Sequence, residues 1–167
     1  RSISTEDHAQ ALTSFADAIW NEKDDAQFTR DEFLEAAVEA DGIITSWGSP
    51  MVSEGVLAKA RRLRIIGHAA GSVKPYVCDE AFSRGIIVVN AASEMAYSVA
   101  EYALAQMLNC LRELPDYVRL MKAGTEQGFK RDHYDAGSCR DLNGKKVGLV
   151  GSGHVARRLI PLLKPFG

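Results

Sequence analysis

Three small residues near the end of the 167-residue chain, Gly151, Gly153 and Ala156, have the spacing G-x-G-x-x-A. In such a turn the first glycine permits the sharp bend, and the second lets the backbone approach a pyrophosphate. The small third residue lets a helix pack closely on a strand. The helix that follows offers free N–H groups and a favourable dipole to phosphates. The spacing therefore predicts pyrophosphate binding by the backbone N–H groups of Gly153, His154 and Val155.

The residues on either side of this turn supply the context that the motif requires. Val147, Leu149 and Val150 predict a short buried strand before the turn, and a helical pattern follows it. The motif alone is weak evidence, and its position between a strand and a helix strengthens it considerably. The alternative is an ordinary tight turn between a strand and a helix. Pro161 falls inside the predicted helix, where it removes a hydrogen bond to Arg157 and is expected to kink or weaken the helix.

The other polar side chains form no recognisable catalytic group. The four histidines, His8, His68, His133 and His154, have no Ser, Asp or Cys partner at a usable spacing. We expect His68 to be a structural residue at the end of a strand, and the imidazole of His154 to be solvated. The sequence therefore assigns no catalytic residue within the chain.

The cysteines and the charge balance exclude several classes of function. Cys78, Cys110 and Cys139 are odd in number and form no CxxC pair. This usage favours a reduced, cytoplasmic setting and predicts neither a disulfide framework nor a metal site. Cys110 lies close to an apolar helix face and is expected to be buried. The net charge of -2 gives no basic surface for nucleic acid, and no apolar run approaches the roughly 18 residues of a membrane span.

Short apolar runs alternate with helical patterns in the first half of the chain. Residues 42–47, 63–69 and 85–91 are rich in Ile and Val and suit strands that are buried on both faces. Residues 17–21 are a weaker strand candidate. Among the helical patterns between the runs, the one that begins at Thr29 has a capping-box sequence. Strands and helices joined by short links predict an α/β fold with a parallel sheet that helices cover on both sides.

The longest predicted element is a helix over residues 94–113, whose apolar side chains recur three and four positions apart. Twenty helical residues reach about 30 Å, enough to connect two domains. Pro115 marks the end of this helix or a restart, because residues 116–124 are helical again. Residues 125–141 are polar and aperiodic and predict an extended surface loop or arm. The domain boundary is expected near Ala91–Glu94.

Three stretches resemble the D-isomer-specific 2-hydroxyacid dehydrogenase family. The stretch DLNGKKVGLVGSGHVARRLIPLLKPFG resembles the family's first nucleotide-binding turn, GIIVVNAASEMAYSVAEYALAQML resembles its strand and interdomain helix, and IIGHAAGSV resembles its substrate-side loop. Together they cover most of residues 42–167. The chain departs from the family pattern at Ala69, which replaces a glycine, at Val73, where Asp is common, and at Met95, where Asn is frequent. These departures leave the substrate preference open.

The resemblance implies a two-domain architecture. Residues 1–92 would form a flavodoxin-like parallel-sheet substrate domain that lacks its usual first strand. Residues 93–167 would form the interdomain helix, the arm and the first βα unit of a Rossmann-type NAD-binding domain, which is truncated. Because residue 1 is Arg, we expect further sequence upstream. The implied substrate-binding residues are Ala70, Gly71 and Ser72, and the implied cofactor-binding residues are Gly151, Gly153, His154, Val155 and Val99.

The activity that the resemblance implies is hydride transfer between NAD or NADP and a 2-keto or 2-hydroxy acid. The family's catalytic Arg, His and Glu or Asp lie well beyond the glycine turn, so we expect this fragment to be inactive by itself. Family members generally dimerise through the cofactor domain, which implies a homodimer. Some corepressors and metabolite sensors share this architecture and bind NAD as a ligand. An NAD-sensing, corepressor-like binding protein is therefore the alternative function.

Overall fold

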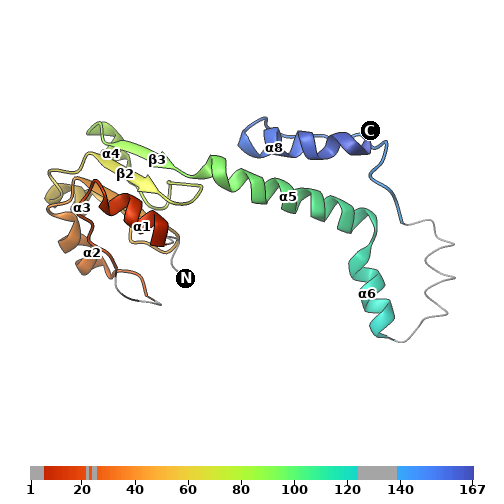
Figure 1. Cartoon of the computed structure of the whole chain (residues 1–167), viewed down its shortest axis with the longest axis horizontal. Helices are drawn as coiled ribbons and strands as arrows, with labels where there is room; N and C mark the ends of the chain where they lie inside the picture. The colour runs from red at the N-terminus through yellow and green to blue at the C-terminus, as the bar shows by residue number, and fades with distance from the viewer. Residues whose placement is uncertain (1–5, 22, 24–25, 124–138) are drawn as a thin grey trace. The chain divides into compact units, whose positions relative to one another are not determined.

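A computed structural model of the chain describes residues 6–21, 23, 26–123 and 139–167. The chain divides into two compact units, Arg1–Ala92 and Ser93–Gly167. Figure 1 follows both units from the red amino-terminal helix to the blue carboxyl-terminal one.

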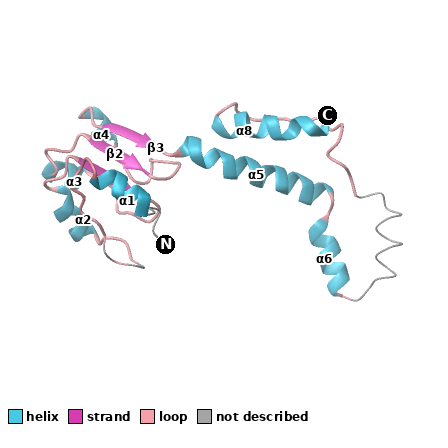
Figure 2. Ribbon diagram, viewed as in Figure 1, coloured by secondary structure: helices cyan, strands magenta, loops and turns pink. Residues whose placement is uncertain are grey.

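The first unit is built on three parallel strands: β1 (Gly42–Thr45), β2 (Ile65–His68) and β3 (Ile87–Asn90), in the order β1-β2-β3. Figure 2 shows β2 and β3 side by side, pointing the same way. The three strands predicted from the apolar runs are confirmed. The weaker candidate at residues 17–21 was wrong, because this segment forms no strand.

One face of the sheet carries the hydrophobic core of the first unit. Ile66 is fully buried at the centre of β2, and its core neighbours come from α2 (Arg30–Ala37), α3 (Glu54–Lys59) and α4 (Asp79–Ser83). The side chains of this core are Phe33, Ala37, Ile43, Val52, Val56, Leu57, Ala60, Leu63, Ile66, Val77, Ala81 and Ile86.

The opposite face of the sheet remains open to solvent. Its apolar side chains Ile44, Ile65, Ile87 and Val89 are 66%, 42%, 60% and 48% exposed. The helix α1 (Glu6–Thr13) has no buried residue. Cover on both sides of the sheet was therefore a wrong prediction for the described residues. Continuous apolar runs are typical of strands that are buried on both faces. Burial of the second face also requires a second layer of helices.

Helix α2 begins with the capping box that its sequence predicted. Thr29 Oγ1 accepts a hydrogen bond from the Glu32 N–H at 3.3 Å, and the Thr29 N–H donates to Glu32 Oε2 at 2.8 Å. Lys23 Nζ lies 2.6 Å from Glu32 Oε1, and this charged hydrogen bond is the largest cause that lowers the pKa of Glu32 to about 2. The reciprocal bonds satisfy two N–H groups that a helix start leaves free.

The regular secondary structure in the described residues of the second unit is helical. Helix α5 (Ala92–Leu111) has the twenty-residue length predicted for it, and α6 (Leu114–Lys122) restarts at Pro115, as the sequence indicated. Between them Glu113 has a positive φ of 51°, which turns the chain. The unit ends with α8 (His154–Leu163) and the short 3-10 helix η1 (Lys164–Phe166).

Specific contacts tie the last part of the chain to α5. The Arg140 N–H donates to the Leu111 carbonyl at 2.8 Å, and Arg112 pairs with Asp141 at 2.6 Å. Arg158 of α8 lies over the ring of Tyr97 of α5, 3.8 Å from its centroid. Such a cation–π contact contributes roughly 0.5–1 kcal/mol at an exposed site. Helices α5 and α8 therefore belong to one folded unit.

The sequence also made predictions for Cys110 and for the polar arm of the second unit. Cys110 was predicted to be buried and is exposed, because no described element covers its side of α5. Most of the predicted polar arm, residues 125–138, lies outside the described residues.

The capping box yields a stability prediction. Replacing Thr29 by Ala removes the acceptor for the Glu32 N–H and should lower the free energy of unfolding of the first unit by about 1 kcal/mol. Thr29→Ser keeps a hydroxyl at the cap and should stay within a few tenths of wild type. Urea unfolding followed by Trp20 and Trp47 fluorescence measures both variants. Equal losses for Ala and Ser would show that the cap contributes nothing.

Candidate functional site

The glycine turn has the backbone geometry that its sequence predicted. Gly151 adopts a positive φ of 96°, a conformation that side chains with a Cβ rarely enter. Gly153 is extended, with φ -74° and ψ -162°, and caps α8, which begins at His154. The chain therefore bends at the first glycine and enters the helix directly after the second.

The two glycines are required for different reasons. Gly151 needs its positive φ, so the fold itself accounts for a glycine there. Gly153 has an ordinary φ, and a Cβ built on it meets no atom within 4 Å. Glycine is among the residues favoured at a helix N-cap, but no backbone angle or neighbouring atom in the described protein requires it at this position, whereas a pyrophosphate against the backbone would. The turn thus fits the phosphate group of a dinucleotide.

The first N–H groups of α8 are available to an anion. The Arg157 N–H is the first to bond within the helix, to the Gly153 carbonyl at 3.1 Å. The preceding N–H groups, at His154 and Val155, are the free donors of a helix start. His154 is exposed and Val155 half-buried. Arg157 Nε also donates to the Ser152 carbonyl at 3.2 Å, which ties the turn to its helix.

The strand predicted before the turn was wrong. Residues 145–150 form no strand in the described structure, and Val147, Leu149 and Val150 are 37%, 40% and 109% exposed rather than buried. A strand exists only where a neighbour supplies the ladder hydrogen bonds, and no described segment pairs here. The local sequence thus predicted the extended run but could not supply its partner.

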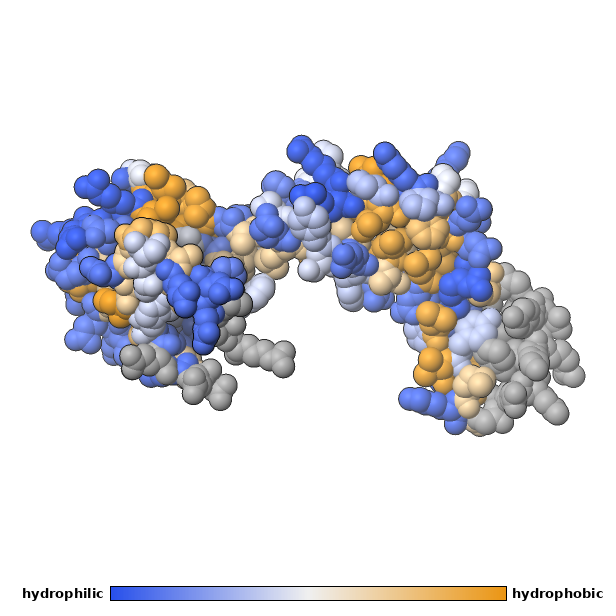
Figure 3. Space-filling view, in the orientation of Figure 1, coloured by the Kyte–Doolittle hydropathy of each residue, from blue (hydrophilic) through white to orange (hydrophobic). Residues whose placement is uncertain are grey.

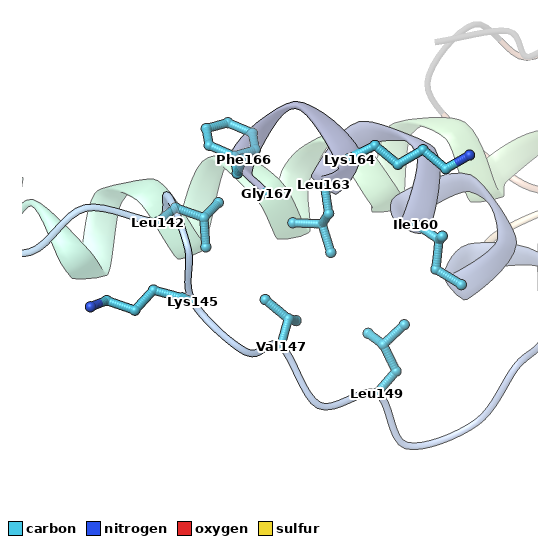
Figure 4. A pocket seen from close by; sticks show the side chains of 9 residues that line it. All are labelled: Leu142, Lys145, Val147, Leu149, Ile160, Leu163, Lys164, Phe166 and Gly167. Carbon is cyan, nitrogen blue, oxygen red and sulfur yellow. The ribbon is translucent and has the colours of Figure 1, made fainter.

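A groove of about 340 Å³ lies between this extended segment and α8. Figure 4 shows Val147 and Leu149 directed toward Ile160 and Leu163 across it. Helix α8 continues through Pro161 to Leu163. The lining is apolar apart from Lys145 and Lys164, so the groove is suited to packing rather than to holding a polar ligand.

The predicted substrate-binding residues follow directly after β2. Ala70 is fully buried, Gly71 is half-buried and Ser72 is exposed. The Ala70 carbonyl accepts a hydrogen bond from the Ala91 N–H at 3.0 Å. The segment therefore leaves the sheet at the carboxyl ends of parallel strands, which is where ligands bind in open α/β folds.

A polar cluster that the sequence did not reveal lies beside this segment. Thr45 and His68 are 1% and 2% exposed, and Thr45 Oγ1 is 2.9 Å from His68 Nδ1. The His68 ring stacks on Tyr76 with its centroid 4.4 Å away. Burial lowers the pKa of His68, because the charged form is disfavoured away from water. The signal available in the sequence was a polar residue at the end of each of two adjacent strands.

The predicted site residues fall into both compact units. Ala70, Gly71 and Ser72 belong to the first unit, and Gly151, Gly153, His154 and Val155 to the second. Val99, the remaining predicted cofactor residue, is on α5 and 43% exposed.

Two negative findings apply to the described ranges 6–21, 23, 26–123 and 139–167. No group of three or more His, Cys, Asp or Glu side chains there is arranged to hold a metal ion. In the same ranges, no helix combines the length and apolar character needed to cross a membrane.

Comparison with known proteins decides the family. The sequence profile described as D-isomer specific 2-hydroxyacid dehydrogenase, catalytic domain, matches residues 3–156. The chain belongs to this family. The resemblance read from the three sequence stretches is thereby confirmed, as is the α/β class with its parallel sheet.

Among curated members of the family, D-3-phosphoglycerate dehydrogenase of Methanocaldococcus jannaschii is 32% identical over 139 residues. The enzyme of the same name from Mycobacterium bovis is 33% identical over 138 residues. Each match covers 83% of this chain and 25% of the relative. The chain thus spans a quarter of the length of these relatives.

Solved structures of the family agree with the fold. A protein of Pyrococcus horikoshii OT3 matches with a TM-score of 0.72 and 26% identity, over 98% of this chain and 47% of that one. D-2-hydroxyisocaproate dehydrogenase matches with a TM-score of 0.63 and 26% identity, over 84% and 41% of the respective chains. An NAD⁺-bound 3-phosphoglycerate dehydrogenase of Entamoeba histolytica matches with a TM-score of 0.55 and 25% identity, over 84% and 39%.

The contrast between the two glycines predicts a loss of stability for a substitution at Gly151 and little change for one at Gly153. Gly151→Ala places a Cβ on a residue with positive φ and should destabilise the turn by about 1–2 kcal/mol. Gly153→Ser places a Cβ in open space and keeps a residue that is favoured at a helix N-cap, so it should leave stability within about 0.5 kcal/mol of wild type. Urea unfolding read from the NMR amide signals of α8 separates the two. A loss at Gly153 as large as that at Gly151 would mean that the fold needs both glycines.

Proposed function

We propose that the protein containing this chain is an NAD-dependent dehydrogenase that interconverts a 2-hydroxy acid and its 2-keto acid. The observation that carries the proposal is the glycine turn, which is bent at Gly151, open at Gly153 and followed by α8. Family membership supports the same reaction class. When bound, NAD would supply the hydride acceptor for oxidation of the hydroxyl carbon.

We assign the two compact units different roles in this proposal. The first unit contributes the substrate side through Ala70, Gly71 and Ser72. The second contributes cofactor binding through the N–H groups at Gly153, His154 and Val155, with Val99 as a further contact. We assign no catalytic residue within the chain. We also propose that the first unit is a flavodoxin-like domain and that the second is part of a Rossmann-type domain.

The proposal names NAD as the cofactor and leaves NADP as the second candidate. The Entamoeba histolytica structure that matches this chain is described as NAD⁺-bound, which favours NAD. The curated relatives named above are dehydrogenases of D-3-phosphoglycerate, so this hydroxy acid is the first substrate to test. The corepressor-like alternative receives no support from these relatives.

We also infer that the intact protein is a cytoplasmic homodimer. The three cysteines, at positions 78, 110 and 139, are free thiols, in keeping with a reducing compartment. Apolar side chains of α5 and α6 are exposed, among them Tyr102 at 66% and Met121 at 57%, and such surface favours an interface. Sedimentation of the intact protein measures the oligomeric state directly.

The test of the proposed function compares the intact protein with the 167-residue chain. The intact protein should oxidise D-3-phosphoglycerate or another D-2-hydroxy acid with NAD, followed by absorbance of the reduced cofactor. The chain alone should give no turnover and should bind NAD only in the millimolar range, because its glycine turn would hold the pyrophosphate alone. Each 1.4 kcal/mol of missing contact raises Kd about tenfold. Failure of the intact protein across a panel of such acids, with NAD and NADP, would reject the proposal.

The glycine turn gives a sharper test of the cofactor role. Gly153→Val in the intact protein puts a branched side chain where the pyrophosphate would lie, and should weaken NAD binding at least about tenfold, or about 1.4 kcal/mol. Gly55→Val is the matched control. Gly55 lies in α3 of the first unit, and a Cβ built on it would have Ser53 Oγ as its nearest neighbour, at 3.8 Å. Titration calorimetry should find unchanged affinity for the control. Unchanged affinity for Gly153→Val would reduce the motif to an ordinary turn.

A further inference from the structure

The buried polar cluster at the carboxyl ends of β1 and β2 is placed by the register of the sheet. Thr45 is the last residue of β1 and lies opposite His68, the last residue of β2. Their 2.9 Å contact between Oγ1 and Nδ1 is made where water is excluded. Asn90 of β3 lies opposite His68 on the other side. The cluster thus stands at the level where the chain leaves the sheet and enters the segment Ala70–Ser72.

Tyr76 closes the other end of this segment. Its ring stacks on His68, with centroids 4.4 Å apart and planes at 28°. Its hydroxyl accepts a hydrogen bond from the Gly48 N–H at 3.3 Å, which draws in the loop after β1. Its carbonyl accepts from the Val52 N–H at 2.8 Å. The seven residues between His68 and Tyr76 are therefore held at both ends by one ring stack.

The hydrogen bonding of His68 makes it suited to holding the segment rather than to proton transfer. One ring nitrogen bonds to Thr45, and the ring is 2% exposed. The other, Nε2, has no partner among the described residues, and neither has Ser46 Oγ, just beyond the end of β1. Thr45 Oγ1 donates to the Gly67 carbonyl at 3.4 Å, which leaves the hydroxyl oxygen to accept from an Nδ1–H of His68. In that tautomer Nε2 is an acceptor without a partner among the described residues. Adding a proton there would create a buried cation with no anion to pair with.

The groups around the ring carry no compensating charge at neutral pH. Thr45 on β1 and Asn90 on β3 are neutral, and Tyr76 is the titratable group against the ring face. Lys74, in the same loop as Tyr76, is exposed. The folded state therefore takes up a proton on His68 less readily than the unfolded chain does. The neutral His68 ring therefore supports the folded state fully above pH 6.5, the ordinary pKa of histidine. The protein loses this stability as the pH falls below that value, because the unfolded chain then takes up the proton first.

We propose that Thr45, His68 and Tyr76 form a positioning cluster that fixes the segment Ala70–Ser72, and that only the neutral form of His68 does so. The substrate role of the segment rests on the proposed function, whereas the cluster itself rests on the contacts described. His68 acts through Thr45 and Tyr76 on the backbone that follows it. The cluster is thus a pH-sensitive support beneath the substrate side of the site.

The first experiment uses the 167-residue chain and needs no catalysis. NMR follows the amide signals of Gly71 and Ser72 and the ring signals of His68 from pH 8 to pH 5, with the Gly85 amide as a reference. The two segment amides should shift together with the His68 ring. The response should vanish in His68→Phe, which keeps a ring on Tyr76 but loses the bond to Thr45. Segment amides that ignore the His68 transition, or an unchanged response in His68→Phe, would overturn the proposal.

Milder variants keep the test decisive if His68→Phe does not fold. Thr45→Val and Tyr76→Phe each remove one hydroxyl and nearly preserve shape, and each should shift the Gly71 and Ser72 amides at pH 8. His68→Asn offers a polar atom near the Nδ1 position and should restore part of the wild-type pattern. His8→Asn, at an exposed histidine, is the matched control and should leave the segment unchanged. Segment amides unmoved in both hydroxyl variants would also reject the cluster.

The second experiment uses the intact protein and splits KM from kcat. Thr45→Val should raise KM for the hydroxy acid about tenfold, equivalent to about 1.4 kcal/mol, with kcat within about twofold of wild type. The wild-type KM should rise as pH falls through the His68 transition, and this rise should be absent in His68→Phe. An unchanged KM in Thr45→Val would reject the positioning role. If the wild-type protein shows no turnover, the proposed function fails, and the NMR result still decides the cluster.

Discussion

The parallel register of β2 with its two neighbours is the constraint on which the first unit depends. Side chains alternate along a strand, so the register that buries Ile43 and Ile66 in the core also buries Thr45 and His68 two residues later. A slip of β2 by one residue would turn Ile66 and His68 toward the open face and away from Ile43 and Thr45. The same strand register therefore determines both the packing of the apolar core and the position of the polar cluster. The core does not take up all the apolar residues of the protein: Figure 3 shows orange, hydrophobic residues exposed on the surface.

Local sequence was sufficient where an element is stabilised by its own residues. The capping box at Thr29 and the twenty-residue length of α5 were both predicted, because helix starts and apolar periodicity are encoded locally. The three strands were predicted because short runs of Ile and Val favour buried β-strands. Three of the errors have a shared cause, which is a missing neighbour. Residues 147–150 need a strand to pair with, the exposed face of the sheet needs a second layer of helices, and Cys110 needs an element that covers it. A sequence pattern indicates that an element can form, but its partners decide whether it does.

The candidate site divides along the same line. The G-x-G-x-x-A spacing predicted the bend at Gly151 and a helix after the turn, since both are properties of a few consecutive residues. The Thr45–His68 pair joins residues 23 positions apart and becomes visible only through the register. His68 was expected to be a structural residue at a strand end, and its position at the end of β2 agrees. Its ring stack on Tyr76 had no signal in the sequence.

The residues that packing does not explain are the most informative ones for function. Gly151 follows from its positive φ, and Ile66 follows from its burial. Gly153 has neither reason, because a Cβ there would meet only open space. His68 is the reverse case: an apolar ring would fill the same space without leaving a buried nitrogen unpaired, a cost of about 1–3 kcal/mol. At Gly153 there is space around the missing Cβ that no described atom fills. At His68 there is a buried polar atom, Nε2, that makes no hydrogen bond with the described residues. Both features lie where the chain turns out of a strand or into a helix, the places at which α/β folds meet their ligands.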